Sequence, residues 1–278
     1  MHSACLPPGG SAPDGVGAMQ DARPHIVVLI PTYDEAENVV PMLEAIDRLG
    51  QRDPARRFTS LVVDDHSPDG TAARARAFAG GRGDIHVLER AREGLGRAMI
   101  AGCRHAQGPL RADVVATIDC DFQWNPDDLP RLLDALDAGA DVAVASRHAP
   151  GGGLEGWPMG RRFTHWVANT VFATWVAGSR EVLDHNGNMR ALRVAGCLDR
   201  IDWDRVPVRG YAFFNWMIHA FSEVDARFAE VPVTFRWRER GHSKVSFTLR
   251  HARTFARDTL EYVRSCLWIR VRRRAAQR

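Results

Sequence analysis

The sequence predicts an α/β protein with a mostly parallel sheet, helices on both of its faces, and a basic amphipathic helix at the carboxyl end. Apolar runs of strand length alternate about five times with segments of helical spacing between residues 25 and 147. Polar side chains follow four of these runs at the points where they end. Nine arginines occur between Arg250 and Arg278, against only Asp258 and Glu261.

Five strands are expected, each from one apolar run: residues 25–33, 58–65, 84–90, 112–121 and 140–147. Helices are expected between them at residues 34–49, 93–106 and 126–139, and residues 67–79 are expected to be a turn entering a helix. The first of these helices would carry acidic residues in its first turn, where the helix dipole favours them. Strands that alternate with helices in this way indicate a parallel sheet.

Polar residues gather at the carboxyl ends of the expected strands. They are Tyr33, Asp34 and Glu35 after the first strand, Asp64 and Asp65 at the second, Asp119 and Asp121 at the fourth, and Ser146 and Arg147 at the fifth. Ligands of open parallel sheets bind beyond these ends, so the clusters predict a binding site along one sheet edge. No glycine-rich dinucleotide or P-loop motif follows the first strand, which argues against dinucleotide oxidoreductases and ATPases.

The stretch VVATIDCDFQWNP, Val114 to Pro126, carries the most specific of these clusters. Burial of an unpaired carboxylate is costly, so Asp119 and Asp121 are expected where the strand leaves the core. At a period of two, Asp119, Asp121 and Gln123 point the same way. Three oxygen-bearing side chains, two of them anionic, suit a hard divalent cation such as Mg²⁺ or Mn²⁺. The alternative is an ordinary passage from strand to loop with solvated carboxylates.

The composition is that of a soluble globular protein: 278 residues, 45% hydrophobic, 26% charged, with a net charge of +3. Five scattered cysteines form no disulfide framework or zinc spacing, which fits a reducing, cytosolic setting. Residues 1–24 are expected to be a disordered leader. No segment reaches the length of a membrane span, and the apolar stretch 166–178 is expected to be a core or interfacial helix.

Several motifs together resemble the family-2 glycosyltransferases, which have the GT-A fold, and within them the dolichol- and polyprenol-phosphate mannose synthases. The motifs are VVLIPTYDEAENV, LVVDDHSPDGTA, GLGRAMIAG, DCDFQWNPDDLPRLL, ASRHAPGGG, WPMGRR and VPVTFRWRERGHSKVS. The resemblance covers about residues 25–250. It implies a GT-A domain at 25–248, a nucleotide-sugar donor and a polyprenyl-phosphate acceptor.

The resemblance also implies roles for individual residues. Pro31, Tyr33, Glu35 and Asp64 would contact the nucleotide, with Asp65 as a structural neighbour. Asp119 and Asp121 would hold Mg²⁺ or Mn²⁺, with Gln123 as a third ligand and Asp119 also near the donor. Arg147, Arg240 and Lys244 would contact phosphates and, with Asp121, form the catalytic set. A guanidinium suits bidentate phosphate binding, whereas a lysine acts as a point charge.

The implied reaction is transfer of mannose from GDP-mannose to a polyprenyl monophosphate with inversion. A lipid monophosphate is already ionised near neutral pH, its second pKa being about 6, so it needs no general base. His165, His185 and His242 are accordingly expected to be hydrogen-bonding or surface residues.

Three departures from the family pattern keep alternatives open. His66 and Trp124 replace a common glycine and a frequent histidine, and DHNGNMRAL replaces a segment of small residues around the retained Arg190. Asn186 and Asn188 could be turn residues with no ligand role. The alternatives are another nucleotide sugar such as UDP-glucose, a small non-lipid acceptor, or a non-catalytic nucleotide-sugar-binding protein.

Residues 249–278 are expected to form a basic amphipathic helix and tail. Its apolar stripe comprises Leu249, Ala252, Phe255, Ala256, Leu260, Val263 and Leu267. We expect 249–262 to pack on the sheet and 263–278 to bind an anionic membrane surface, which predicts a peripheral protein at the cytoplasmic membrane face. No aromatic-lined basic groove accompanies the tail, so nucleic acid is not expected as a partner.

Overall fold

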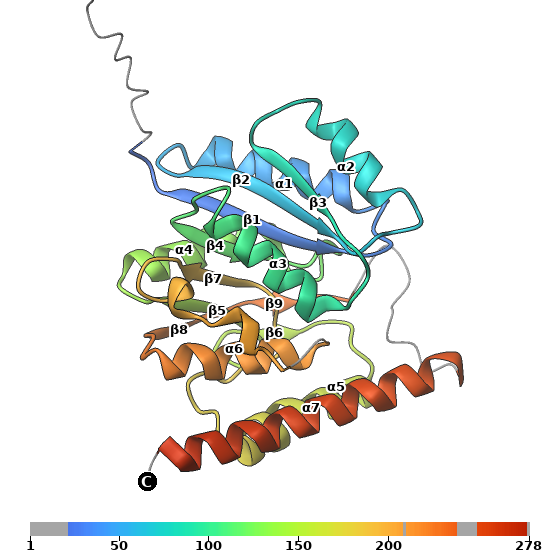
Figure 1. Cartoon of the computed structure of the whole chain (residues 1–278), viewed down its shortest axis with the longest axis vertical. Helices are drawn as coiled ribbons and strands as arrows, with labels where there is room; N and C mark the ends of the chain where they lie inside the picture. Colours follow the sequence, from blue (N-terminus) through green and yellow to red (C-terminus); the bar gives the residue numbers. More distant parts are fainter. Residues whose placement is uncertain (1–21, 208–209, 238–248, 277–278) are drawn as a thin grey trace, which may run out of the picture.

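The computed structural model describes residues 22–207, 210–237 and 249–276, and its centre is a seven-stranded sheet (Figure 1). The strands are β1 (His25–Thr32), β2 (Arg57–Asp64), β3 (Ile85–Glu89), β4 (Val114–Thr117), β5 (Val142–Ser146), β7 (Arg190–Arg193) and β8 (Phe228–Pro232). Their order is β3-β2-β1-β4-β7-β5-β8, and every pairing is parallel except those of β7. The predicted fold class is therefore confirmed.

Alternate residues of β1 enter two separate cores, one on each face of the sheet. Val27 and Leu29 pack with α3 (Leu95–Gln107) and α6 (Ala212–Glu223) on one face. Ile26, Val28 and Ile30 pack on the other face with α1 (Val39–Arg52), α2 (Thr71–Ala79) and α4 (Leu129–Asp137). A strand buried on both sides needs apolar residues at every position, which is why the first run reads as continuous.

Strand β7 was not predicted, and it changes the neighbours of the fifth expected strand. It runs antiparallel between β4 and β5, with Ala191 opposite both Ala116 and Ala143. The carboxyl ends of β2, β1 and β4 are therefore direct neighbours, while Arg147 after β5 lies one strand further away. The chain between β5 and β7 crosses this edge and supplies side chains to it.

Two expected boundaries are wrong. The first helix begins at Val39 rather than at residue 34, so its first turn contains no acidic residue. The backbone carbonyl of Glu35 accepts from the amides of Asn38 and Val39 and starts the helix from the preceding turn. Strand β4 ends at Thr117, four residues before Asp121, because the chain turns there.

Smaller elements complete the domain. A two-stranded sheet pairs β6 (Gly153–Leu154) with β9 (Thr234–Phe235). Short 3₁₀ segments are η1 (Pro126–Asp128), η3 (Leu198–Arg200) and η4 (Trp203–Arg205). Helix α5 (Met159–Trp166) continues into the π-helical segment η2 (Val167–Val176), so the apolar stretch at 166–178 is largely helical, as expected.

The final helix, α7 (Leu249–Ala276), packs on α6 and η2 rather than on the sheet, and runs alongside α5 (Figure 1). Its buried side is formed by Tyr262, Ser265, Cys266 and Ile269. Leu260 and Leu267, members of the predicted apolar stripe, face outward and are about half exposed, at 57% and 49%. Among the stripe residues whose side chains the structure describes, Ala256, Leu260 and Leu267 are exposed and Val263 is half-buried, so this part of the stripe faces away from the core.

Two arginines of α7, Arg270 and Arg273, are held by the rest of the protein. Arg270 donates to the carbonyl of Val176, and Arg273 donates to the carbonyl of Gly178 and pairs with Glu181. These contacts dock the 263–276 segment on the chain between η2 and Glu181. Within the described ranges, no helix combines the length and apolarity needed to cross a bilayer.

Candidate active site

The D-x-D segment leaves the sheet in a tight turn, so the turn rather than strand alternation aims its side chains. Ile118 still donates to the carbonyl of Leu29 on β1 at 3.2 Å. Phe122 then adopts a positive φ of 59°, and the amide of Gln123 donates to Asp121 Oδ1 at 3.1 Å. Asp121 and Gln123 are each only 7% exposed, whereas Asp119 is half-buried. The expectation that the carboxylates lie where the strand leaves the core is confirmed.

Two neighbours hold this segment in place. Asn188 donates to Asp119 Oδ1 at 2.7 Å, which ties the loop before β7 to the carboxylate. Gln123 Nε2 donates to the carbonyl of Arg236 at 3.2 Å, and the Arg236 amide donates back to the carbonyl of Gln123. The amide nitrogen of Gln123 is therefore engaged, and Oε1 is the atom that would coordinate a cation.

The donor set suits the cation that the sequence predicts. Asp119, Asp121 and Gln123 offer carboxylate and amide oxygens, the ligands that Mg²⁺ and Mn²⁺ prefer. In the described part of the chain, no histidine or cysteine joins these carboxylates in a metal-ligating cluster. These residues fit a hard divalent ion.

The ends of β1 and β2 meet at the same edge. Thr32 pairs in register with Asp64 and donates its hydroxyl to Asp64 Oδ2 at 2.9 Å. The amide and hydroxyl of Ser67 also donate to Asp64, which is fully buried. Asp64 thus holds the turn that follows β2 against the end of β1 at this sheet edge. Asp65 pairs with Arg90 and accepts from the amide of Gly94, the structural role expected of it.

The remaining predicted nucleotide contacts lie around the first turn after β1. Pro31 belongs to the strand and is half-buried. The half-buried Tyr33 carries the guanidinium of Arg92 over its ring, 3.7 Å from the ring centroid. Glu35 is buried and accepts from Asn38 Nδ2 at 2.7 Å. The structure brings these residues to the edge that holds Asp64 and the D-x-D segment.

Arg147, whose contact with phosphate stays a prediction, makes a buried ion pair. Its Nε and Nη2 donate to the two carboxylate oxygens of Asp184 at 2.6 and 2.7 Å, and its backbone amide adds a third bond at 3.0 Å. The guanidinium lies over the rings of Trp124 and Phe235, 5.1 and 5.2 Å from their centroids. Burial acts to raise the pKa of Asp184, but Arg147 outweighs it and holds this pKa far below its usual range.

Asp184 is the important residue that sequence reasoning did not single out. It opens the divergent segment Asp184–Leu192, and only the fold brings it to Arg147. Trp124, another departure from the family pattern, packs closely against this segment. A Cβ added at Gly187 would meet the Trp124 ring at 3.0 Å, so the large ring and the glycine fit each other.

Arg190 and His185 serve structure in the same segment. Arg190 is buried and donates to the carbonyls of Gly187, Phe214 and His185 at 2.9–3.0 Å. Burial lowers its pKa to about 9. His185 is also buried, and its ring contacts Asn169 Oδ1 at 3.3 Å, while burial lowers its pKa to about 4. The expectation that His185 is a hydrogen-bonding residue is confirmed.

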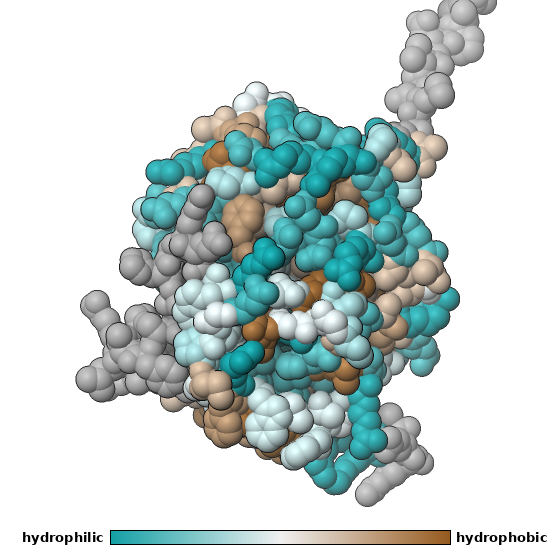
Figure 2. All heavy atoms as spheres, turned by 180° about the vertical axis from the view of Figure 1, so that it is seen from behind, coloured by the Kyte–Doolittle hydropathy of each residue, from teal (hydrophilic) through white to brown (hydrophobic). Residues whose placement is uncertain are grey.

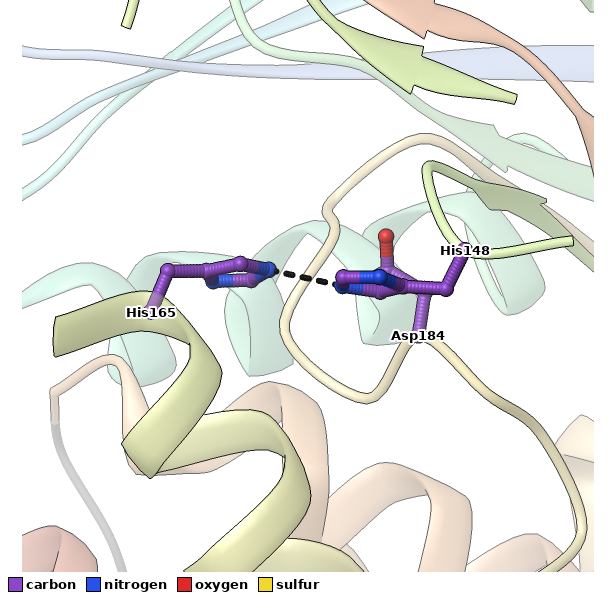
Figure 3. Close-up of side chains that lie close together, drawn as sticks. All are labelled: His148, His165 and Asp184. Atoms are coloured by element: carbon purple, nitrogen blue, oxygen red, sulfur yellow. Dashed lines mark hydrogen bonds between the residues drawn. The ribbon is translucent and has the colours of Figure 1, made fainter. Parts of the chain in front are cut away.

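His165 meets a second histidine, His148, beside Asp184 (Figure 3). The two Nε2 atoms are 3.0 Å apart. Burial and then the charge of Arg147 lower the pKa of His165 to about 3. Arg240, Lys244 and His242 lie outside the described residues, so the roles assigned to Arg240 and Lys244 stay predictions.

Comparison with known proteins identifies the family of this chain. The model of glycosyl transferase family 2 matches residues 27–198, which include β1, the D-x-D segment and Asp184. The undecaprenyl-phosphate mannosyltransferase of Micrococcus luteus is 39% identical over 224 residues, covering 80% of this chain and 88% of that protein. The polyprenol monophosphomannose synthase of Mycolicibacterium smegmatis is 40% identical over 228 residues, covering 79% and 80%.

Solved structures agree on the fold. Glucosyl-3-phosphoglycerate synthase from Mycobacterium tuberculosis, in complex with Mn²⁺ and UDP-glucose, superposes with a TM-score of 0.62 at 19% identity. The match covers 88% of this chain and 79% of that one. The predicted resemblance to polyprenol-phosphate mannose synthases is confirmed by the two curated relatives. This chain is a glycosyltransferase and belongs to glycosyl transferase family 2.

Proposed function

We propose that this protein transfers a mannosyl group from GDP-mannose to a polyprenyl monophosphate with inversion at the anomeric carbon. The observation that carries the proposal is the 39–40% identity, over most of both chains, to two proteins named for polyprenyl-phosphate mannose synthesis. The oxygen-only cluster of Asp119, Asp121 and Gln123 supports it, since a nucleoside diphosphate leaves most readily with a cation on its phosphates.

The reaction is a single displacement. A phosphate oxygen of the acceptor forms a bond to C1 of the sugar while the bond from C1 to the diphosphate oxygen breaks, and the electron pair leaves with the nucleoside diphosphate. Asp119, Asp121 and Gln123 would hold Mg²⁺ or Mn²⁺, which when bound neutralises charge that grows on the leaving group. Glu35, Tyr33 and the β1–β2 edge would orient the nucleoside.

No side chain needs to remove a proton, because the acceptor phosphate is ionised near neutral pH. His165 supports this view, because a histidine whose pKa lies near 3 is a weak base. Arg240 and Lys244 would hold the two anionic groups together, a task for fixed positive charge. Arg147 would add to this charge only in part, since Asp184 neutralises it.

We also propose that the end of the molecule formed by α5, η2 and α7 rests on an anionic membrane surface. Phe163, Trp166 and Trp175 are exposed there, at 63%, 46% and 63%. Apolar and weakly polar side chains gather at this end of the molecule in Figure 2. Aromatic side chains of this kind favour the boundary between headgroups and acyl chains.

The outward side of α7 supports the same surface. Leu260, Arg264, Leu267, Val271 and Arg274 are all exposed and recur every three or four residues, so they form one stripe along the helix. Apolar side chains between arginines suit an anionic bilayer, from which a polyprenyl tail cannot leave. Four cysteines in the described ranges are free and buried, which fits a reducing compartment and so the cytoplasmic face.

The test is product analysis with radiolabelled donors. Purified protein would be supplied with GDP-mannose or UDP-glucose, each with and without polyprenyl phosphate, and the products separated by thin-layer chromatography. Label should enter the lipid fraction only with GDP-mannose and polyprenyl phosphate together. Label from UDP-glucose, or in a water-soluble product, would replace the donor or the acceptor in the proposal. No product in any arm, with retained nucleotide binding, would indicate a non-catalytic nucleotide-sugar-binding protein.

A further inference from the structure

Two histidines from different elements converge beside the Arg147–Asp184 pair. His148 follows β5, where the Ser146 hydroxyl accepts from the amides of His148 and Ala149 and fixes the turn. His165 comes from α5, and the edge of the Trp157 ring packs against it, with centroids 5.6 Å apart. In Figure 3 the two rings point toward each other from opposite sides, and Asp184 lies beside His148.

The facing atoms are both Nε2. They lie 3.0 Å apart, and the ring planes differ by only 9°. Two imidazoles in this position cannot both carry a proton at Nε2, because two N–H groups would then point at each other. One ring must therefore present a lone pair, and a cation that both rings could share would replace the single proton between them.

We propose that His148 and His165, together with Asp184, form a binding site for a transition metal ion of the zinc class. The ligand atoms of the three residues all lie within 4.8 Å of one another. Zinc binds imidazole nitrogen at about 2.0–2.1 Å, which puts two tetrahedral nitrogen ligands about 3.3 Å apart. Because the facing rings lie almost head-on, with centroids 5.2 Å apart, they would have to tilt until both lone pairs converge on the ion, as well as separate by a few tenths of an ångström.

Protonation and charge agree with this assignment. A ligating histidine must be neutral, and burial lowers the pKa of both His148 and His165. The carboxylate of Asp184 stays ionised, and Glu230 accepts from the Asp184 amide at 3.1 Å. These two carboxylates offset the nearby positive charges of Arg147 and Arg161, which act on the His165 ring.

Asp184 would serve two partners at once. Its Oδ2 accepts from the amide and Nε of Arg147, whereas Oδ1 accepts from Arg147 Nη2 and, at a longer 3.3 Å, from the Asn186 amide. Oδ1 is the oxygen that can turn toward a metal, while Oδ2 keeps its hydrogen bonds to Arg147. Water would complete the coordination, as in other open zinc sites.

The site differs in chemistry from the D-x-D cluster. Imidazole nitrogen prefers zinc and its neighbours in the periodic table, whereas the oxygens of Asp119, Asp121 and Gln123 prefer Mg²⁺ or Mn²⁺. A metal at the histidines would also tie α5, which carries the exposed aromatic residues, to the turn after β5. Binding is expected whether or not the transferred sugar is mannose, so the two proposals fail independently.

The experiment is a Zn²⁺ titration of metal-free protein by calorimetry, in a large excess of Mg²⁺ so that the oxygen cluster is already filled. Wild-type protein should bind one Zn²⁺ per chain, and His148→Ala and His165→Ala should each weaken this binding about tenfold or more. Asp121→Asn should leave it unchanged. His86→Ala is the matched control, because His86 and His105 also lie close, at 6.4 Å between centroids, but are tilted by 55°.

Co²⁺ offers a second readout that does not depend on affinity alone. Wild-type protein should give the intense visible absorption of a four-coordinate Co²⁺ site with nitrogen ligands, and His165→Gln should lose it. Zn²⁺ should raise the melting temperature of wild-type protein and not that of His165→Gln, whose own fold is checked by circular dichroism without metal. Equal Zn²⁺ affinity in wild type and both alanine variants, or no binding in wild type, would overturn the proposal.

Discussion

Arg147 and Asp184 show how a single buried charge depends on its partner. Among the salt bridges of residues 22–207, 210–237 and 249–276, theirs has the least exposed side chains, at 5% and 0%. The bidentate geometry, the added backbone bond and the two aromatic rings compensate for the loss of water around both charges. Neither partner can be neutralised alone without leaving the other uncompensated.

The consequence can be measured. Asp184→Asn should lower the free energy of unfolding by about 3–5 kcal/mol, because the guanidinium of Arg147 would remain buried without a counter-charge. Urea denaturation would give the value. Asp204→Asn is the control, since Asp204 pairs with Arg104 at the surface and its loss should cost no more than about 1 kcal/mol. Equal losses in both variants would show that the Arg147–Asp184 pair does not stabilise the fold.

The lowered pKa of His185 predicts that the protein loses stability on acidification. Burial lowers its pKa to about 4 in the folded protein, below the ordinary 6.5, so the unfolded chain binds the proton more readily between these values. Stability should therefore fall as the pH drops below about 6.5, by about 2 kcal/mol from this residue between pH 7 and pH 5. The pH profile of stability, measured by urea denaturation, should be shallower for His185→Gln than for wild type by that amount.

Substitution of Asp121 tests the proposed role of the metal in turnover. Asp121→Asn should reduce turnover about 100-fold or more, because the cluster would lose a carboxylate while its buried turn keeps a side chain of the same shape. The melting temperature should stay close to that of wild type. Asp127→Asn, six residues along and exposed, should keep full activity. Undiminished turnover of Asp121→Asn, or of wild type in excess EDTA, would remove the metal from the proposed function.

At the scale of elements, the sequence predicted which segments form strands and helices better than it predicted which elements lie side by side. Continuous apolar runs such as 26–30 identify β1 because both faces of the strand are buried. Strand β7 escaped because RALR is short and places arginines at both ends, and its burial comes from neighbours distant in sequence. The turn that follows β4 contains a positive φ at Phe122, which an ordinary aromatic residue does not signal.

The candidate site was likewise predicted only in part. The D-x-D segment, Asp64 and Glu35 were predicted because strand ends in a parallel sheet share one edge. The pairing of Arg147 with Asp184 and the meeting of His148 with His165 could not be predicted. Arg147 and Asp184 are 37 positions apart, and His148 and His165 are 17 positions apart. Only tertiary packing determines the directions of the loop and the helix that bring them together.

Residues 249–262 of α7 were expected to pack on the sheet, but the stripe residues described there, Ala256 and Leu260, face outward. Ile269 is completely buried against α6 and η2, whereas Val271 is 67% exposed on the opposite side. Ile269→Ala should therefore lower the free energy of unfolding by about 2–5 kcal/mol, and Val271→Ala by no more than about 0.5 kcal/mol. Chemical denaturation of the two variants compares them directly. The reverse ranking would mean that the apolar stripe containing Leu267 packs inward after all.

At the scale of the whole molecule, the sheet edge and the aromatic end must serve one reaction. The proposed acceptor is a lipid, so the protein has to meet a bilayer while its donor arrives from water. Truncation after Val263 cannot test this, because it would remove the buried Cys266 and Ile269 along with the arginines. Surface substitutions that leave the core intact are the sharper probe.

Three double variants separate the contributions to membrane binding. Phe163→Ser with Trp175→Ser removes exposed aromatic side chains, and Arg264→Ser with Arg274→Ser removes charge from the outward stripe of α7. Arg48→Ser with Arg131→Ser removes the same charge from exposed positions on α1 and α4 and serves as the control. Each variant would be sedimented with liposomes containing phosphatidylglycerol over a range of salt concentrations.

Wild-type protein should sediment at low salt and be released as salt screens the attraction. Since each basic residue near anionic headgroups contributes about 1 kcal/mol, loss of Arg264 and Arg274 should weaken binding about 30-fold and flatten its salt dependence. Loss of Phe163 and Trp175 should weaken binding at every salt concentration, because apolar burial is not screened. The control should bind as wild type does. If both test variants sediment as fully as the control, the membrane contacts another part of the protein, and the outward stripe of α7 has no role in it.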